Sequence, residues 1–159
     1  MTSPGRRLVT DGPAGESPAE RRHRTLSELK RTVRHHPAVI VVTGTQGDDG
    51  RFRDLEVTFD PLMLGVDADH AALRIEWRPR PAPTEPAHFA FHYHDTTGRD
   101  FGWHREPNPH VDGLEQYQER AGAEQEYDDQ SVDVDPNSPV DLLWTILGWI
   151  EERLSSDSV

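Results

Sequence analysis

The chain has 159 residues, no cysteine and a formal net charge of −12, from 29 acidic residues against 17 basic ones. This length predicts one domain with one hydrophobic core, and the lack of cysteine excludes disulfides, thiolate metal ligands and cysteine nucleophiles. The sequence contains no apolar run of membrane-spanning length and no hydrophobic region typical of a secretion signal, so we expect a cytoplasmic protein. Lys30 is the only lysine. This acidic, arginine-using composition resembles that of proteins from salt-accumulating halophiles.

The N-terminal quarter is predicted to be a disordered arm followed by a helix. Residues 1–16 are rich in Gly, Pro, Ser and Arg and show no apolar period. The helix starts at Ser17, because a capping serine, Pro18 at the first helical position and Glu20 form a capping-box pattern, and it ends before Pro37. Its narrow apolar stripe is Leu26, Leu29 and Val33. The basic residues around that stripe indicate a solvent-exposed face, or else a surface that contacts the acidic remainder of the chain.

Three strands are predicted next. The run AVIVVTGTQ from Ala38 indicates a buried strand, and a Gly-Asp-Asp-Gly turn leads into a second strand at residues 52–59. Residues 61–66 are apolar without a clear period. In the third strand, apolar and charged residues alternate, with Leu73, Ile75 and Trp77 on one face. A stiff proline-rich linker at residues 79–86 follows.

The segment from His88 to His110 holds five of the nine histidines and is the most informative part of the chain. A period of two predicts a strand with an aromatic face and a histidine face. The aromatic face is Phe89, Phe91 and Tyr93, and the histidine face is His88, His92 and His94. A three-residue loop ending in a left-handed Gly98 would pair Tyr93 with Phe101 and Phe91 with Trp103. That register brings together four polar side chains on one face: His92, His94, Asp100 and His104.

The rest of the chain is predicted to be an acidic loop and a final helix. Residues 112–135 carry nine acids and the single Arg120 and indicate mostly loop, with a short strand at 131–134. Ser138 and Pro139 then start a helix with one apolar stripe. The stripe is Val140, Leu143, Trp144, Leu147, Ile150 and Leu154. The elements together predict an α+β fold, a curved antiparallel sheet of four to five strands with an N-terminal and a C-terminal helix packed on it. The single domain would span residues 17–155, with a tail at 156–159.

Three functions fit the histidines. As acid–base catalysts they would cleave RNA at its own 2′-hydroxyl without a metal, because imidazole titrates near neutral pH. The candidate catalytic residues are His92, His94, His104 and His110, and the candidate substrate-binding residues are Arg99, Arg105 and Asn108. A metal site would instead use His92, His94 and His104 or Asp100. In the third function this face binds a partner protein, and the histidines only respond to pH or lie on the surface without a chemical role.

Several well-defined sites are not predicted. The sequence has no Gly-rich phosphate loop, no serine nucleophile elbow and no zinc-protease helix pattern. We therefore expect no cofactor, and we expect no membrane partner.

The order of features in residues 89–147 carries a family resemblance. An aromatic strand and hairpin lead to a strand ending in Trp103-His104-Arg105-Glu106, then to a Pro/His loop at residues 107–110, an acidic segment and a helix opened by Ser138-Pro139. This order resembles the TumE-like toxins of toxin–antitoxin pairs. The chain departs from that family at His104-Arg105, where Asp-Asn is usual, and at residues 117–119, where further histidines are expected.

The resemblance implies a small intracellular toxin that acts on RNA and is neutralised by a DNA-binding, helix-turn-helix antitoxin covering the histidine face. The alternative from another class is a non-enzymatic regulatory, protein-binding module of a halophile. The sequence leaves the substrate, the identity of the partner and the oligomeric state open.

Overall fold

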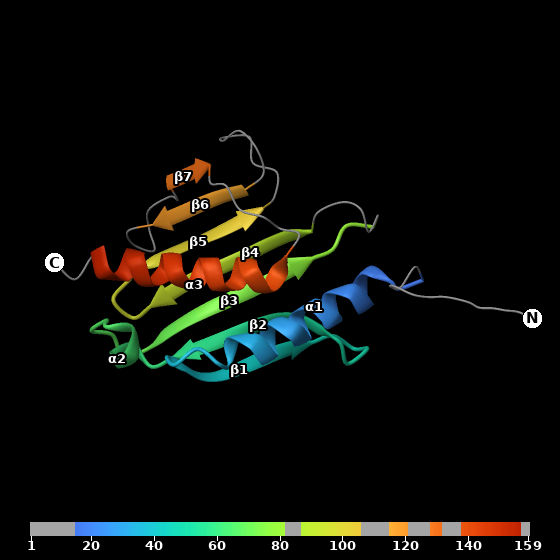
Figure 1. Cartoon of the computed structure of the whole chain (residues 1–159), viewed down its shortest axis with the longest axis horizontal. Coiled ribbons are helices and arrows are strands. Elements are labelled where there is room, and N and C mark those ends of the chain that lie inside the picture. The colour runs from blue at the N-terminus through green and yellow to red at the C-terminus, as the bar shows by residue number, and fades with distance from the viewer. Residues whose placement is uncertain (1–14, 82–86, 106–114, 121–127, 132–137, 157–159) are drawn as a thin grey trace, which may run out of the picture.

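The protein folds as one antiparallel sheet with two long helices on it, as seen in the computed structural model (Figure 1). The structure describes residues 15–81, 87–105, 115–120, 128–131 and 138–156. Seven strands follow one another in chain order: β1 Val39–Gln46, β2 Phe52–Phe59, β3 Ala71–Arg78, β4 His88–Asp95, β5 Asp100–Arg105, β6 Glu115–Arg120 and β7 Asp128–Ser131. The helices are α1 Pro18–Val33, the short α2 Pro61–Leu64 and α3 Pro139–Ser156.

The predicted α+β fold is confirmed, including the antiparallel sheet and the two terminal helices packed on it. α1 begins with the expected capping box. The Ser17 hydroxyl accepts a hydrogen bond from the Glu20 backbone N–H at 3.1 Å, and the Glu20 carboxylate accepts one from the Ser17 N–H at 2.8 Å. These two hydrogen bonds satisfy the backbone N–H groups of Ser17 and Glu20 at the start of the helix.

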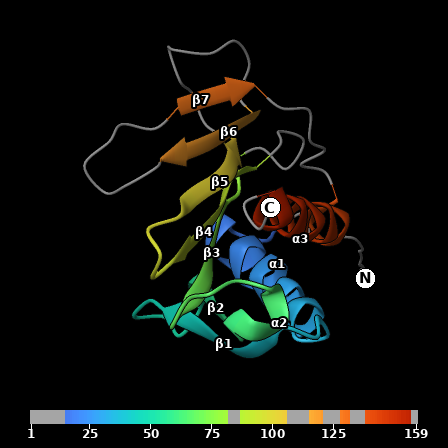
Figure 2. The same cartoon turned by 90° about the vertical axis from the view of Figure 1, so that its left-hand side faces the viewer.

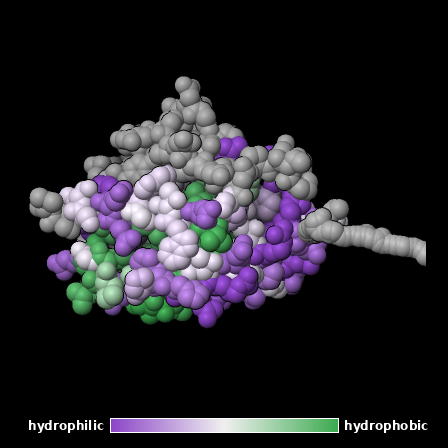
Figure 3. Space-filling model, in the orientation of Figure 1, coloured by the Kyte–Doolittle hydropathy of each residue, from purple (hydrophilic) through white to green (hydrophobic). Residues whose placement is uncertain are grey.

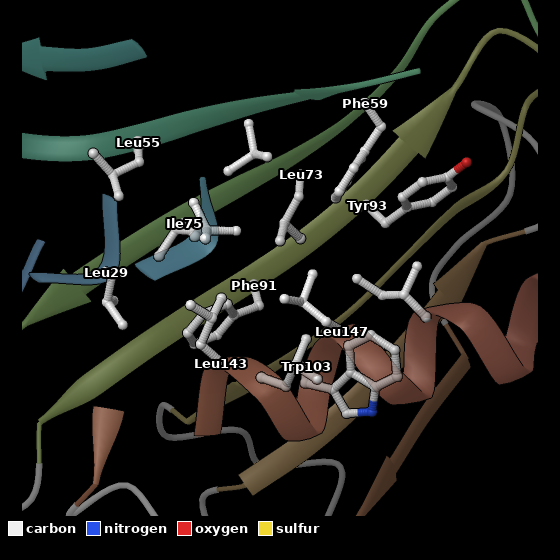
Figure 4. Packing of buried hydrophobic residues seen from close by; sticks show 14 of the residues in the cluster. Leu29, Leu55, Phe59, Leu73, Ile75, Phe91, Tyr93, Trp103, Leu143 and Leu147 are labelled. Carbon is white, nitrogen blue, oxygen red and sulfur yellow. The ribbon is translucent and has the colours of Figure 1, made fainter. Parts of the chain in front are cut away.

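The core lies between the sheet and the helices (Figure 4). Alternate residues of β2, β3 and β4 face this side, because successive side chains of a strand point to opposite faces. They include Leu55, Val57, Phe59, Leu73, Ile75, Phe91 and Tyr93, all at most 1 % exposed. Leu29 of α1 and Leu143 of α3 meet them from the other side, and both are fully buried. The apolar stripe of α1 and the alternation of β2 and β3 are as the sequence predicts.

The β4–β5 hairpin has the predicted register. Tyr93 pairs with Phe101 and Phe91 with Trp103. Gly98 is left-handed, with φ of +97°, and its N–H donates to the Asp95 carbonyl at 3.1 Å. A three-residue loop with a left-handed glycine therefore closes the hairpin, and this loop length decides which side chains share a face.

Two strand predictions are corrected. β1 was expected to be buried, but it is an edge strand in which Val42 is the only buried residue. Ile40 and Val41 lie on this outermost strand, next to the register shift between Val39 and Val41, and are 63 % and 48 % exposed. The acidic segment was expected to be mostly loop with a short strand at 131–134, but among its described residues β6 pairs with β5, and β7, at Asp128–Ser131, pairs with β6. These two strands extend the sheet beyond the four to five that the sequence predicts.

The predicted position of Trp144 is also wrong. Its side chain was placed on the buried stripe of α3, but the residue is 42 % exposed. Leu142 and Ile146 are buried instead, so α3 is rotated about its axis toward that flank. Trp149 packs on Trp103, with ring centroids 5.6 Å apart.

Some predictions lie outside the described residues. These are the arm over residues 1–14, the greater part of the proline-rich linker, and the exit loop with Asn108 and His110. Among the described segments, no helix is both long enough and apolar enough to cross a membrane.

Candidate functional site: the open face of the sheet

The face of the sheet opposite the core is polar. Figure 2 shows α1, α2 and α3 on the same side of the sheet, so no described helix covers the other side of β1–β5. We call the histidine-bearing part of that side the histidine face. By strand alternation and register it consists of His88, His92, His94, Asp100 and His104. The sequence prediction that His92, His94 and His104 share a face agrees with this register.

His92 and Asp100 make a direct contact on the histidine face. The imidazole Nε2 of His92 lies within hydrogen-bond distance of Asp100 Oδ1 across the β4–β5 hairpin. Both side chains are partly buried, with 26 % and 19 % of their surface exposed. A carboxylate in this position fixes the orientation of an imidazole ring and favours one of its two tautomers.

The missing side chain of Gly102 makes room for that contact. Gly102 pairs with His92 in the hairpin. A Cβ atom at this position would lie 2.7 Å from His92 Nδ1 and 2.9 Å from His92 Cα, and closer still to the Phe91 carbonyl oxygen. The His92 ring therefore lies over the bare backbone of Gly102 and reaches Asp100 beyond it. The sequence signal for this contact is a glycine in the middle of a strand, because such a glycine indicates the close approach of another group.

His94 and His104 differ in accessibility. The His94 side chain is 45 % exposed, its Nε2 lies 3.8 Å from Glu56 Oε2, and its ring lies 6.2 Å from that of His70. His104 pairs with Ala90 and belongs to the same face, but only 5 % of it is exposed. Of these two imidazoles, His94 is the one that a large molecule can reach directly.

Arg74 is a cation of this face that the sequence analysis did not single out. It pairs with His92 across β3 and β4. Its Nη2 donates to Asp54 at 2.8 Å and its Nε to Glu76 at 3.0 Å, while half of its side chain stays exposed. Sequence alternation put Arg74 on the outer side of β3, but only the order of the strands brings it beside a histidine.

The arginines proposed from sequence as substrate contacts lie elsewhere. Arg99 belongs to the hairpin loop, where its Nη1 donates to the Thr97 hydroxyl at 2.9 Å and to Asp95 at 3.3 Å. Arg105 ends β5, and strand alternation puts it on the side of Phe101 and Trp103, which face the core. Both positions point to roles in the fold rather than to a contact with the histidine face.

Asp95 anchors this hairpin from the core side. Its carboxylate accepts hydrogen bonds from the Tyr93 hydroxyl at 2.7 Å and from the Thr97 N–H at 2.9 Å. Burial alone would raise the pKa of the Asp95 carboxyl, but the hydrogen bonds from Thr97 and Tyr93 and the charge of Arg99 bring this pKa below its ordinary value. Burial and the Asp95 charge raise the pKa of Tyr93. The carboxylate is thus held ionised and the phenol neutral.

The open face is negatively charged when its histidines are neutral. Across β2–β5 it carries two arginines against four carboxylates, namely Arg74 and Arg78 against Asp54, Glu56, Glu76 and Asp100. Within the described part of the chain, no three His, Cys, Asp or Glu side chains converge as metal ligands do. The direct contact between His92 and Asp100 is suited to proton transfer and ion pairing.

Comparisons with protein-family models, with curated proteins and with solved structures find no match for this chain.

Proposed function

We propose that the protein is a small toxin that cleaves RNA by acid–base catalysis on the histidine face, inside the cell that makes it. The observation that carries this proposal is the contact between His92 and Asp100 on a sheet face that no described helix covers. An imidazole oriented by a carboxylate is a common arrangement of catalytic acids and bases. The resemblance of residues 89–147 to TumE-like toxins supports the same function.

The proposed reaction needs two imidazoles. One accepts the proton of the ribose 2′-hydroxyl as its oxygen attacks the neighbouring phosphorus. The other donates a proton to the departing 5′-oxygen, which leaves a 2′,3′-cyclic phosphate. His92 and His94 are two residues apart on β4 and point to the same side. Arg74 lies next to His92 and supplies a guanidinium for the phosphate, a role that the sequence analysis gave to Arg99 and Arg105.

The charge of the open face predicts the pH dependence of this function. At neutral pH a polyanion meets more carboxylates than arginines there. The proposed reaction needs one imidazole that accepts a proton and another that donates one. We therefore expect the rate of cleavage to pass through a maximum as the pH is varied.

The proposed partner is a DNA-binding antitoxin with a helix-turn-helix fold that covers the histidine face. An uncovered polar face on the sheet of a small protein is a plausible target for such a partner, and the carboxylate excess suits a basic one. The same excess favours a second candidate function, a non-enzymatic module that only binds a basic protein. The two functions differ in whether His92 and His94 are needed when the protein acts alone.

Growth after induction of the chain without its partner tests the proposal. We expect the wild type to arrest growth and the variant with His92→Ala and His94→Ala to grow. The matched control is His35→Ala, which removes an exposed imidazole at the end of α1, on the helix side of the molecule. Purified wild type and both variants are then incubated with RNA in the presence of a chelator.

The outcomes separate the two functions. Growth arrest and cleavage by the wild type and the control, but not by the double variant of equal melting temperature, support the toxin. A wild type that neither arrests growth nor cleaves RNA at any pH between 6 and 8 contradicts it. If the double variant still arrests growth, a non-enzymatic binding module is the better description of the protein.

A further inference from the structure

The edge strand β1 lacks charge in a strongly charged protein. Residues 38–46 contain no Asp, Glu, Lys or Arg, although 29 % of the chain is charged. Six of the eight residues of β1 are β-branched valine, isoleucine or threonine, at positions 39–43 and 45. Among the described strands β1 has a neighbour on one side only, β2. Its outer edge therefore presents backbone N–H and C=O groups without a flanking strand.

Proteins commonly protect such an edge with charges, prolines or bulges. β1 has register shifts only near its ends, at Ile40 and at Gln46, and pairs regularly with β2 from Val41 to Thr45. The opposite edge of the sheet differs, because the four residues of β7 include Asp128 and Asp129. The edge at β1 carries no charge that would oppose pairing with a second copy.

Exposed apolar residues adjoin this edge. α2 follows β2 directly, and the Asp60 N–H at its start donates to the Ala38 carbonyl at 2.8 Å. Leu62 and Met63 of α2 are 83 % and 58 % exposed, and Ile40 and Val41 of β1 are 63 % and 48 % exposed. Figure 3 shows hydrophobic residues along the lower left and the lower border of the molecule, over α2 and β1. A cluster of this kind usually marks a contact surface.

We propose that β1 pairs in antiparallel orientation with β1 of a second copy of this chain. Antiparallel pairing of a strand with itself has two-fold symmetry and needs no second type of surface. Centred on Thr43, it places Val41 of each copy opposite Thr45 of the other, so β-branched residues meet across the axis. Each copy has a net charge of −12, and the uncharged edge is where two such molecules approach with least repulsion. A charged partner strand would find no complementary charge there.

The pairing would join two sheets into one and leave both histidine faces open. It does not depend on the function proposed for those faces. In each copy the helices lie on the side of the sheet opposite its histidine face (Figure 2).

The mass of the protein in solution tests this proposal. Sedimentation over a range of concentrations, in molar salt to screen repulsion, should show a concentration-dependent species of twice the 18.0 kDa chain mass. Val41→Lys places a charge on the edge and should weaken association by at least about tenfold, because a charged side chain on an edge strand opposes its pairing with another strand. Thr145→Lys is the matched control, because it adds the same charge at an exposed position of α3.

Hydrogen exchange provides a second readout in the unaltered protein. Amides of residues 41–45 should become more protected as the concentration rises, while those of α3 should not change. A wild type that is monomeric at all concentrations and salt levels overturns the proposal, whether or not another protein binds this edge. The proposal is also overturned if Val41→Lys associates as strongly as the wild type, or if the wild type associates without added protection of the β1 amides.

Discussion

At the scale of single residues, Asp95 has the clearest energetic role. Its side chain is fully buried, yet it stays ionised because Tyr93, Thr97 and Arg99 all donate to it. These donors belong to the end of β4 and to the loop after it. Asp95 therefore holds the loop closed and keeps His92 and His94 in register with β5.

Replacing Asp95 by Asn should destabilise the protein in a pH-dependent manner. We expect a loss of about 2 kcal/mol in the free energy of unfolding at pH 7, because the charged hydrogen bonds are lost. The pKa of Asp95 is lower in the folded protein than its ordinary value. Its stabilising contribution is therefore complete above pH of about 4 and is lost as the pH falls through the lowered pKa.

Urea unfolding of wild type and Asp95→Asn at pH 7, 5 and 3 measures this effect. The difference between the two proteins should be equal at pH 7 and 5 and smaller at pH 3. A difference that grows on acidification would show that the pKa of Asp95 is raised in the folded state.

Gly102→Ala should separate His92 from Asp100. The new Cβ would overlap the His92 ring and the backbone of Phe91, so the ring must rotate or β5 must shift. We expect a loss of roughly 1–3 kcal/mol of stability from overpacking, together with loss of the His92–Asp100 contact. Gly148→Ala on α3 is the matched control, since no heavy atom lies within 4 Å of its added Cβ, and a helical alanine should add roughly 0.5–1 kcal/mol.

Crystal structures and melting curves of both variants check this prediction. If Gly102→Ala keeps the His92–Asp100 contact and the wild-type melting temperature, then the glycine has no part in placing the imidazole.

The composition of the histidine face could be predicted from the sequence, but its contacts could not. A period of two assigned His92 and His94 to one side of β4, and the glycine in the loop set the register that brings Asp100 close. Arg74 comes from a strand 18 positions earlier, and its place beside His92 depends on the order of β3 and β4. The exposure of His94 and the burial of His104 depend on neighbouring strands, which local periodicity does not specify.

At the scale of elements, α3 illustrates an ambiguity of apolar helices. Leu143, Leu147, Ile150 and Leu154 define a buried row that the sequence predicts correctly. Either flank of that row is apolar, with Val140 and Trp144 on one side and Leu142 and Ile146 on the other. The choice between the two flanks depends on packing against the sheet and α1. Helical spacing does not specify that packing.

The exposed position of Trp144 changes the expected effect of its removal. Its indole stacks on His36, with centroids 6.4 Å apart, at the border of the core. Trp144→Ala should cost about 1 kcal/mol, whereas Leu143→Ala should cost about 2–5 kcal/mol, because Leu143 is fully buried. Denaturant unfolding of both variants tests this order, and an equal or greater cost for Trp144→Ala would show that the indole is part of the core.

At the scale of the whole molecule, the net charge of −12 opposes the compact state. The sheet concentrates part of this charge, because Asp54, Glu56, Glu76 and Asp100 all lie on its open face. Arg74 and Arg78 neutralise some of it through ion pairs with Asp54 and Glu76. The arginines of these pairs are more than half exposed, so each pair contributes little and the pairs do not offset the general repulsion.

Salt should therefore stabilise this protein. The screening length falls from about 10 Å at 0.1 M to about 3 Å at 1 M, which weakens repulsion between distant carboxylates more than attraction within the close ion pairs. We expect the melting temperature to rise between 0.1 and 1 M potassium chloride, by several degrees if the repulsion amounts to roughly 1 kcal/mol. Calorimetry at a protein concentration where the wild type is monomeric excludes a contribution from association. The charge-neutralising variant Glu56→Gln should melt higher than the wild type at 0.1 M and show a smaller rise with salt. A melting temperature that falls with salt would mean that the ion pairs outweigh the repulsion.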